Sequence, residues 1–401
     1  MKTIAVIGAG ASGMLAALSA AEAGAHAVLF ERQARIGRKL LATGNGRCNL
    51  TNTGAALAHY HGEDPAFVLP ALAAFPPQEA VEYFRSLGLV CTEQYGGRVY
   101  PFSDAAGSVL DVLRYALDAA EVEVCPGESV RQIVPDGQGM LVKTEQGCRR
   151  ADAAIVACGG RAGGRLGGVG DGYELLRSLG HSVTKLHSSL VPLFTDTDYP
   201  RSLKGVRAEA GVRLTLGEET VAESRGEVQF TEKGVSGPAV FDVSRAGAIE
   251  GGVLHLDLLP GLGEKDVLAL LLQRQRLSPE KENGALFAGI LHSRLGLAAV
   301  KAASLRPSEP LGGRTGRELK MLAHTAKDFC LTITGADSLD NAQVTAGGVR
   351  TAEFDPETLE SRLAPGVYAC GEVLDIDGDC GGYNLQWAWA SGRLAGRSAA
   401  L

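Results

Sequence analysis

Six residues near the N-terminus have the types and the spacing needed to hold a pyrophosphate. Residues 8–13 read GAGASG, with glycine at the first, third and sixth positions. Gly8 would allow a tight turn, Gly10 would let a pyrophosphate approach the backbone, and Gly13 would let a helix pack close to the preceding strand. The free N–H groups and the positive dipole end of that helix would bind the phosphates. The predicted phosphate-binding residues are Gly8, Gly10, Ala11, Ser12 and Gly13.

The elements that must position this turn are present on both sides of it. Thr3–Ile7 is an apolar, β-branched run typical of a buried parallel strand. Residues 14–23 are rich in helix formers and end at Gly24, and His26–Phe30 is a second strand followed by Glu31. Glu31 could accept hydrogen bonds from both hydroxyls of an adenosine ribose, which disfavours a 2′-phosphate. The pattern predicts a dinucleotide site rather than a chance glycine turn, and by itself it does not separate FAD from NAD.

Composition excludes several other classes of protein. The 401 residues suffice for two or three domains, and an apolar content of 45% with 21% charged residues is ordinary for a globular protein. No apolar run reaches the roughly 18 residues of a spanning helix, and the N-terminus is already a strand of the fold, so we expect a cytoplasmic protein without a membrane partner. A net charge of −7 argues against a large nucleic-acid-binding surface but does not exclude a local basic patch.

Cysteine and histidine spacing predicts no metal site. Eight cysteines are scattered along the chain without a CxxC pair, which indicates reduced thiols in a cytosolic protein. His59 and His61 lack a carboxylate or cysteine at ligand spacing, so surface polar roles are expected for them. We therefore expect the site to contain no metal.

A basic, glycine-rich segment follows Glu31. Four basic residues lie within residues 32–39, and glycines then alternate with polar side chains up to Asn49. One interpretation is a solvated loop and a turn. The other places the segment over the dinucleotide, with Arg38 or Lys39 near phosphate and backbone N–H groups of residues 44–46 against the N5/O4 edge of a flavin. The candidate binding residues are Arg32, Arg38, Lys39, Thr43, Gly44, Asn45, Gly46 and Asn49.

At these residues the chain resembles a known family. GAGASG followed by E-x5-G-R-K-L-L-x-T-G-N-G-R-C-N-x-T-N is similar to the BaiN-like and YhiN-type flavoproteins, which are NAD(P)/FAD-dependent oxidoreductases. The resemblance continues in GRVYP at residues 97–101, in GEVQFTEKGVSGP at residues 226–238 and in TAGGV at residues 345–349, so it spans nearly the whole chain. It implies that the dinucleotide is FAD.

The resemblance also implies further contacts with FAD. Residues 157–159 end a buried strand where the family's chain passes close to the cofactor, and Val130 lies on the strand that often meets adenine. Glu372 would take a ribityl hydroxyl, and the N-terminus of the last helix would stabilise reduced flavin at N1/O2. Cysteines replace the usual threonines at 158 and 380. The implied binding residues are Val130, Ala157, Cys158, Gly159, Gly371, Glu372, Gly381, Gly382, Tyr383, Asn384 and Leu385.

The predicted architecture is α/β, with a discontinuous Rossmann-like FAD-binding fold of the two-dinucleotide type. Residues 1–190 and 330–401 would form the FAD-binding domain. Alternating apolar runs predict an inserted small antiparallel barrel over residues 191–262. Residues 263–329 would form an inserted helical segment, with helices expected at Glu264–Arg276, Gly284–Leu297 and Gly316–Lys327.

The expected reaction is hydride transfer, driven by NADH or NADPH, to an activated C=C bond conjugated to a carbonyl. Such chemistry needs a proton source, for which the candidates are Cys48, whose pKa the neighbouring Arg47 could lower, and Tyr383. The family implies two acceptors, a small-molecule enone of the steroid type or a uridine of ribosomal RNA reduced to dihydrouridine. A non-catalytic flavin redox sensor and a dehydrogenase that uses oxygen remain alternatives.

Overall fold

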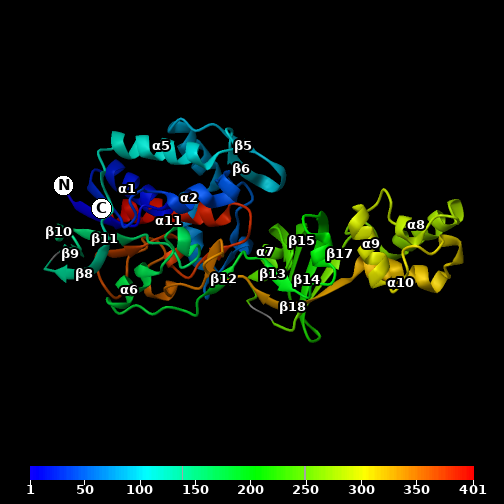
Figure 1. Cartoon of the computed structure of the whole chain (residues 1–401). Coiled ribbons are helices and arrows are strands. Elements are labelled where there is room, and N and C mark those ends of the chain that lie inside the picture. The colour runs from blue at the N-terminus through cyan, green and yellow to red at the C-terminus, as the bar shows by residue number, and fades with distance from the viewer. Residues whose placement is uncertain (138, 248–249) are drawn as a thin grey trace. The chain divides into compact units, whose positions relative to one another are not determined.

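The computed structural model describes residues 1–137, 139–247 and 250–401 (Figure 1). Its internal contacts divide the chain into two compact units. Unit 1 comprises Met1–Ser188 and Leu339–Leu401, and unit 2 comprises Ser189–Ser338. The chain thus returns to unit 1 at Leu339 rather than at the expected residue 330, because the strand Phe329–Ala336 belongs to the barrel of unit 2.

A five-stranded parallel sheet forms the centre of unit 1. The strand order is β20-β11-β1-β2-β7, and every neighbouring pair is parallel. The first strand of the chain is central and β20 comes from the C-terminal part, so the fold closes only when both ends of the chain are present. This confirms the predicted Rossmann-like fold. The strands are β1 (Thr3–Ile7), β2 (His26–Glu31), β7 (Glu123–Pro126), β11 (Ala153–Val156) and β20 (Val367–Ala369).

Helices and smaller strand groups complete unit 1. The helices are α1 (Ala11–Glu22), α2 (Arg38–Ala42), α3 (Leu69–Ala74), α4 (Pro77–Ser86), α5 (Ala106–Ala119), α6 (Asp171–Arg177) and α11 (Tyr383–Ala400). The other strands are β3 (Thr51–Asn52), β4 (Tyr60–His61), β5 (Cys91–Glu93), β6 (Arg98–Pro101), β8 (Val130–Asp136), β9 (Gly139–Thr144), β10 (Cys148–Ala151), β12 (His187–Ser189), β19 (Val344–Ala346) and β21 (Asp377–Gly378).

The first and last long helices pack closely through small residues. An ideal Cβ on Gly392 of α11 would lie 2.3 Å from the carbonyl oxygen of Ser12, and one on Gly396 would lie 2.1 Å from that of Ala16. Only glycine allows this approach of two helix backbones. The packing fixes the N-terminus of α11 relative to the glycine turn that precedes α1.

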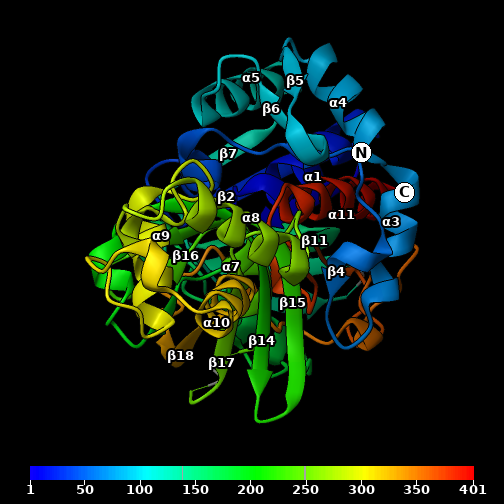
Figure 2. The same ribbon diagram turned by 90° about the vertical axis from the view of Figure 1, so that its right-hand side faces the viewer.

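A closed antiparallel barrel forms the core of unit 2. Its order is β13-β16-β15-β14-β17-β18, and closure leaves no sheet edge exposed. β14 and β15 run side by side along a long hairpin (Figure 2). Alternate residues of β14, including Val212 and Leu214, are buried. The strands are β13 (Leu193–Thr195), β14 (Arg207–Leu216), β15 (Glu219–Phe230), β16 (Gly234–Ser236), β17 (Val253–Asp257) and β18 (Phe329–Ala336), and α7 (Pro238–Ser244) follows β16.

Besides α7, three further helices of unit 2 share one hydrophobic core with the barrel. α8 (Glu264–Leu277) and α10 (Gly316–Lys327) match their expected ranges. The expected helix Gly284–Leu297 is wrong in its bounds: α9 spans Ser293–Ala302. The ring nitrogen Nδ1 of His292 accepts a hydrogen bond from the Arg294 N–H and caps the helix there, and Gly289 with a φ of +76° lies outside it.

Candidate active site and cofactor cradle

The three motif glycines at and before the start of α1 have different surroundings. Gly8 has a φ of +104°, and an ideal Cβ on it would lie 2.6 Å from the carbonyl oxygen of Ala157. A Cβ on Gly13 would lie 1.8 Å from the carbonyl oxygen of Gly8. A Cβ on Gly10 would meet no heavy atom of the described residues within 4 Å, its chain neighbours aside. Two glycines are therefore needed for packing, whereas Gly10 borders open space at the N-terminus of α1.

The end of β11 meets this turn directly. The Ala157 N–H donates to the carbonyl oxygen of Ile7, and the Cys158 Sγ lies 3.4 Å from the same oxygen. Burial raises the pKa of the Cys158 thiol well above its ordinary value. Ala157 and Cys158 therefore lie beside the glycine turn because β11 and β1 are adjacent parallel strands.

Glu31 lies at the end of β2 beside the turn. Its Oε2 accepts a hydrogen bond of 3.0 Å from the Ala9 N–H, and its Oε1 accepts one of 2.8 Å from the Gln33 N–H. Burial raises the pKa of this carboxyl against the opposing effect of both hydrogen bonds. The Glu128 N–H donates to the carbonyl oxygen of Glu31, which brings the start of β8, with Val130, next to it. The two residues expected at the adenosine end therefore lie in one region.

Lys39 and Glu372 form an ion pair although 333 positions separate them in the sequence. Lys39 Nζ lies 2.7 Å from Glu372 Oε2, and the Thr345 N–H donates to Glu372 Oε1 over 2.8 Å. Arg38 instead donates to Gln33 Oε1 and to the carbonyl oxygen of Arg165, and Arg32 lies 4.0 Å from Asp171. The structure thus joins the basic segment to the Gly-Glu motif through Lys39.

The loop after α2 is held in a left-handed backbone conformation. Gly44, Asn45, Gly46 and Cys48 have φ values of 57°, 56°, 86° and 59°. Left-handed conformations cost non-glycine residues free energy and concentrate at functional sites. The N–H groups of Arg47 and Cys48 donate to the carbonyl oxygens of Gly44 and Thr43, so backbone hydrogen bonds within the loop hold this conformation.

Residues 49–52 contact the turn at the N-terminus of α11. The Asn52 Nδ2 donates to the carbonyl oxygen of Gly381 over 2.9 Å, and an ideal Cβ on Gly382 would lie 2.5 Å from the Thr51 carbonyl group. The Asn49 Oδ1, which that same Cβ would approach to 3.0 Å, is buried and has no hydrogen-bond partner among the described residues. A buried acceptor of this kind is costly unless a ligand or water satisfies it.

These features match the chemistry of FAD. A helix N-terminus with open space at Gly10 suits a pyrophosphate. The orphaned Asn49 acceptor and the start of α11 present polar groups where a ring with N–H and C=O edges could bind. Asn384, one of the expected cofactor-binding residues, has a structural contact instead. Its side-chain amide both donates to and accepts from the backbone of Gly378 and so stabilises the turn before α11.

Comparisons with known proteins agree with this geometry. The model of the family described as HI0933-like protein Rossmann domain matches residues 2–398. The chain belongs to this family. It is 41% identical over 407 residues to a 3-dehydro-bile acid delta(4,6)-reductase of Clostridium scindens, with 100% of this chain and 99% of that protein covered. It is 29% identical over 388 residues to a ribosomal RNA dihydrouridine synthase of Escherichia coli, with 96% and 95% covered.

Solved structures show the same fold. A 3-ketosteroid delta1-dehydrogenase from Sterolibacterium denitrificans aligns with a TM-score of 0.54 at 13% identity, covering 100% of both chains. A 3-ketosteroid-delta4-(5alpha)-dehydrogenase from Rhodococcus jostii gives 0.51 at 16% identity, with 99% of this chain and 96% of that chain covered. Together with the cradle and the 41% identical reductase, the family membership makes this HI0933-like chain a flavin-dependent oxidoreductase.

Cys48 of this HI0933-like chain does not have the expected low pKa. Its thiol is fully buried, and burial raises its pKa to about 12. The prediction that Arg47 lowers this pKa is wrong because the guanidinium faces elsewhere: Nε lies 2.6 Å from Asp104 Oδ1, and Cζ lies 4.3 Å from the ring centre of Tyr100. The thiol therefore keeps its proton at neutral pH.

Tyr383 lies in a polar cluster that the sequence analysis missed. Its ring stacks on His59 with centroids 4.3 Å apart. Asp379 lies 2.9 Å from His59 Nδ1 and 2.6 Å from His61 Nε2. Burial acts to raise the pKa of Asp379, but the hydrogen bonds with both histidines outweigh it and lower that pKa. The sequence shows no carboxylate at ligand spacing from His59 and His61. The pairing of β4 with β21 brings Asp379 beside them, although Asp379 lies 318 positions after His61.

Unit 1 also contains a hydrogen-bonded arrangement of Ser361, His181 and Glu353, three residues whose spacing in the sequence does not predict it. His181 Nε2 lies 2.9 Å from Ser361 Oγ, and Nδ1 lies 2.8 Å from Glu353 Oε2. Ser361 Oγ accepts hydrogen bonds from the N–H groups of Leu363 and Ala364. Since this hydroxyl is buried and fixed by the backbone, the arrangement stabilises the loop before β20.

Among the described residues, no helix combines the length and the apolar character that crossing a bilayer requires. The eight cysteines are free thiols.

Proposed function

We propose that this flavin-dependent oxidoreductase uses NADH or NADPH to reduce an activated C=C bond conjugated to a carbonyl in a small molecule. The bile-acid and steroid enones are the proposed substrate class. The observation that carries the proposal is the 41% identity, along the full length of both chains, to a protein named as a delta(4,6)-reductase. The steroid-dehydrogenase neighbours support the fold only. We further propose that the protein works in the cytoplasm.

Bound FAD would supply hydride acceptance and donation. The protein's own part is to bind and orient it. The turn at Gly10 and the N-terminus of α1 would bind the pyrophosphate, and Glu31 would accept hydrogen bonds from the ribose. Glu372, oriented by Lys39 and the Thr345 N–H, would accept from the ribityl chain.

The start of α11 and Tyr383 would act at the reacting end. The helix dipole at Gly382–Leu385 would favour negative charge on the flavin. Reduction of an enone also needs a proton at the carbon next to the carbonyl. Tyr383, whose ring stacks on His59, is the better candidate for that proton, because the Cys48 thiol is fully buried and has a pKa of about 12.

A second candidate is reduction of a uridine in ribosomal RNA. Dihydrouridine synthases of Escherichia coli and Haemophilus influenzae are 29% and 28% identical to this chain. Uridine also carries a C=C bond conjugated to a carbonyl, so the same site could act on it. The lower identity and the net charge of −7 favour the small molecule.

An anaerobic experiment distinguishes these substrates. The bound flavin is bleached with NADH or NADPH, and its absorbance is followed while a 3-oxo-Δ4 bile acid, a quinone or ribosomal RNA is added separately. We expect the bile-acid enone to reoxidise the flavin and to yield the saturated product. Reoxidation by RNA alone would support the second candidate. If neither nicotinamide bleaches the flavin, the proposed electron donor is wrong, and a redox sensor or an oxygen-using dehydrogenase becomes the better account.

A further inference from the structure

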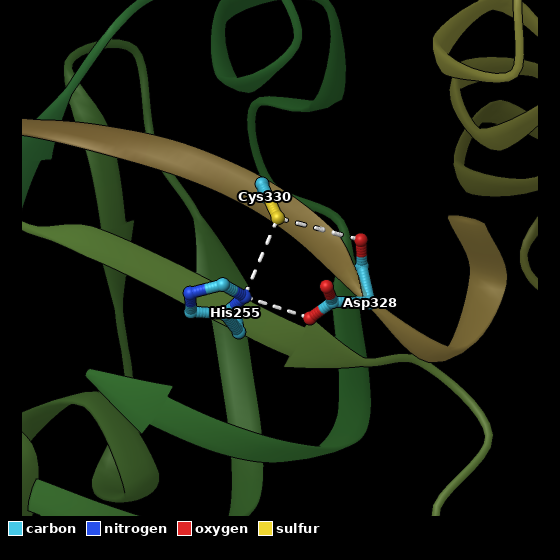
Figure 3. Close-up of side chains that lie close together, drawn as sticks. All are labelled: His255, Asp328 and Cys330. Carbon is cyan, nitrogen blue, oxygen red and sulfur yellow. Dashed lines mark hydrogen bonds and ion pairs between the residues drawn. The ribbon is translucent and has the colours of Figure 1, made fainter. Parts of the chain in front are cut away.

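Three side chains on the barrel of unit 2 converge on one point (Figure 3). His255 lies on β17 directly opposite Cys330 of β18, and Asp328 precedes that cysteine by two residues. His255 Nδ1 lies 2.7 Å from Asp328 Oδ1 and 3.4 Å from Cys330 Sγ. One candidate ligand atom from each of the three residues lies within 4.8 Å of the other two.

The cluster is not arranged as a catalytic relay. In a nucleophile–histidine–acid relay the two partners contact opposite nitrogens of the ring. Here the carboxylate and the thiol both approach Nδ1, and Nε2 lies 3.1 Å from Thr215 Oγ1. A partner on Nε2 fixes the ring orientation and leaves Nδ1 facing the carboxylate and the thiol, as in histidines that bind metals.

We propose that His255 Nδ1, Asp328 Oδ1 and Cys330 Sγ bind a divalent zinc-type metal ion. Imidazole, thiolate and carboxylate are the ligand set of zinc, at distances of about 2.0–2.3 Å. Ligand atoms around a tetrahedral ion at these distances are roughly 3.3–3.6 Å apart. The nitrogen–sulfur distance of 3.4 Å already meets that geometry, whereas the carboxylate must withdraw from the ring by a fraction of an ångström.

The surroundings leave a position for water and contain one competitor. His255 and Asp328, together with Arg213 and Asp257, help to line a depression of about 260 Å³, so a fourth ligand can come from solvent. Arg213 lies 3.6 Å from Asp328 Oδ1 and must yield to the metal ion. Lys327 is not a competitor, because its Nζ lies 2.6 Å from Asp257 and also donates to two backbone carbonyl oxygens.

Metal titration of the full-length flavoprotein tests the site. The protein is stripped with a chelator, and Zn²⁺ affinity is measured by competition with a chromophoric chelator. Co²⁺ then serves as a spectroscopic probe, because its visible d–d bands lie at longer wavelengths than flavin absorption. We expect one Zn²⁺ per chain and Co²⁺ bands typical of tetrahedral coordination. Failure of the wild-type protein to bind Zn²⁺ at micromolar concentrations overturns the proposal.

Variants identify the ligands. Cys330→Ser and His255→Gln should each weaken Zn²⁺ binding by at least about tenfold, since even the loss of a group that orients a ligand costs about 10- to 100-fold. Cys148→Ser, which removes an exposed thiol of unit 1, is the matched control and should bind Zn²⁺ as the wild type does. Flavin absorbance and circular dichroism verify folding. Equal affinity in Cys330→Ser and wild type, or an equal loss in Cys148→Ser, contradicts the assignment.

Arg213, which competes with the metal ion for Asp328, provides an independent test in which no proposed ligand is removed. Arg213→Met removes the cation beside Asp328 and should tighten Zn²⁺ binding by several-fold. Unchanged affinity would mean that Asp328 is not a ligand and would overturn the three-ligand site.

Discussion

The glycine turn of unit 1 and the His255–Asp328–Cys330 cluster of unit 2 place polar chemistry by different means. The turn occupies six consecutive residues, and its N–H groups belong to the backbone, so its function is visible in a linear pattern. The cluster joins residues 73 and 75 positions apart through the pairing of β17 with β18. Local motifs can be recognised from a single sequence, whereas sites set by strand register need the fold.

The largest expected effect comes from Gly13, the residue on which the local arrangement depends most. Gly13→Ala would place a Cβ 1.8 Å from the carbonyl oxygen of Gly8. We expect a loss of about 3 kcal/mol or more in the free energy of unfolding, measured by urea denaturation, because the backbone must shift to accommodate the methyl group.

Gly107→Ala is the matched control, since a Cβ there would meet no heavy atom of the described residues within 4 Å. It should change the unfolding free energy by less than about 1 kcal/mol. Equal losses in the two variants would show that close helix–strand packing is not what Gly13 provides.

Tyr383→Phe tests the proposed proton source, which lies where distant segments of the chain meet. The substitution keeps the stacking on His59 and removes the hydroxyl. We expect kcat for enone reduction to fall by about 100-fold, as is typical for the loss of an acid catalyst, with FAD content unchanged. Tyr115→Phe, on an exposed tyrosine, is the control. Unaltered kcat in Tyr383→Phe would exclude this residue as the proton source.

Gly10→Ala tests the contribution of the glycine turn to FAD binding separately from its contribution to helix–strand packing. The added methyl group has space in the protein, so stability should change by no more than about 1 kcal/mol. It would occupy the place of a phosphate oxygen, and FAD affinity should fall by about tenfold, or about 1.4 kcal/mol. Flavin titration of the apoprotein measures this. If affinity stays at the wild-type value, the phosphates do not bind at this turn.

Cys48 should make stability depend on alkaline pH. Because burial raises the pKa of its thiol from the ordinary 9.0 to about 12, its contribution is fully present below pH 9 and is lost as pH rises toward 12. Between about pH 8 and about pH 10, the wild type should lose about 1.4 kcal/mol more unfolding free energy than Cys48→Ala does. Urea denaturation at both pH values measures the difference, and equal losses would contradict the buried, protonated state.

The fold was predictable to the extent that it depends on local patterns. β1, the glycine turn, α1 and β2 follow from a short contiguous stretch, and α8 and α10 from helix-forming residues with clear ends. The expected helix Gly284–Leu297 failed because apolar content alone does not show that His292 caps a later start. The barrel's last strand, β18, was assigned to the FAD-binding domain, because it pairs with a strand about 75 positions earlier in the chain.

In the candidate site, too, features that depend on local sequence were predictable, and features that depend on distant residues were not. The position of Glu31 beside the glycine turn was predictable, since motif spacing along one short stretch determines the local backbone. The pKa of Cys48 was not, because it depends on burial and on where the Arg47 guanidinium points. Likewise, Asp379 joins His59 and His61 only through the pairing of β4 with β21. Side-chain environment, unlike backbone conformation, is a property of the whole fold.

The flavin content of the purified full-length chain tests most directly whether the protein binds FAD. The protein is denatured, and the released cofactor is identified and quantified by chromatography against its absorbance. We expect one FAD per chain, either retained through purification or taken up when FAD is added. Release of NAD or FMN instead, or failure of added FAD to bind, would contradict it.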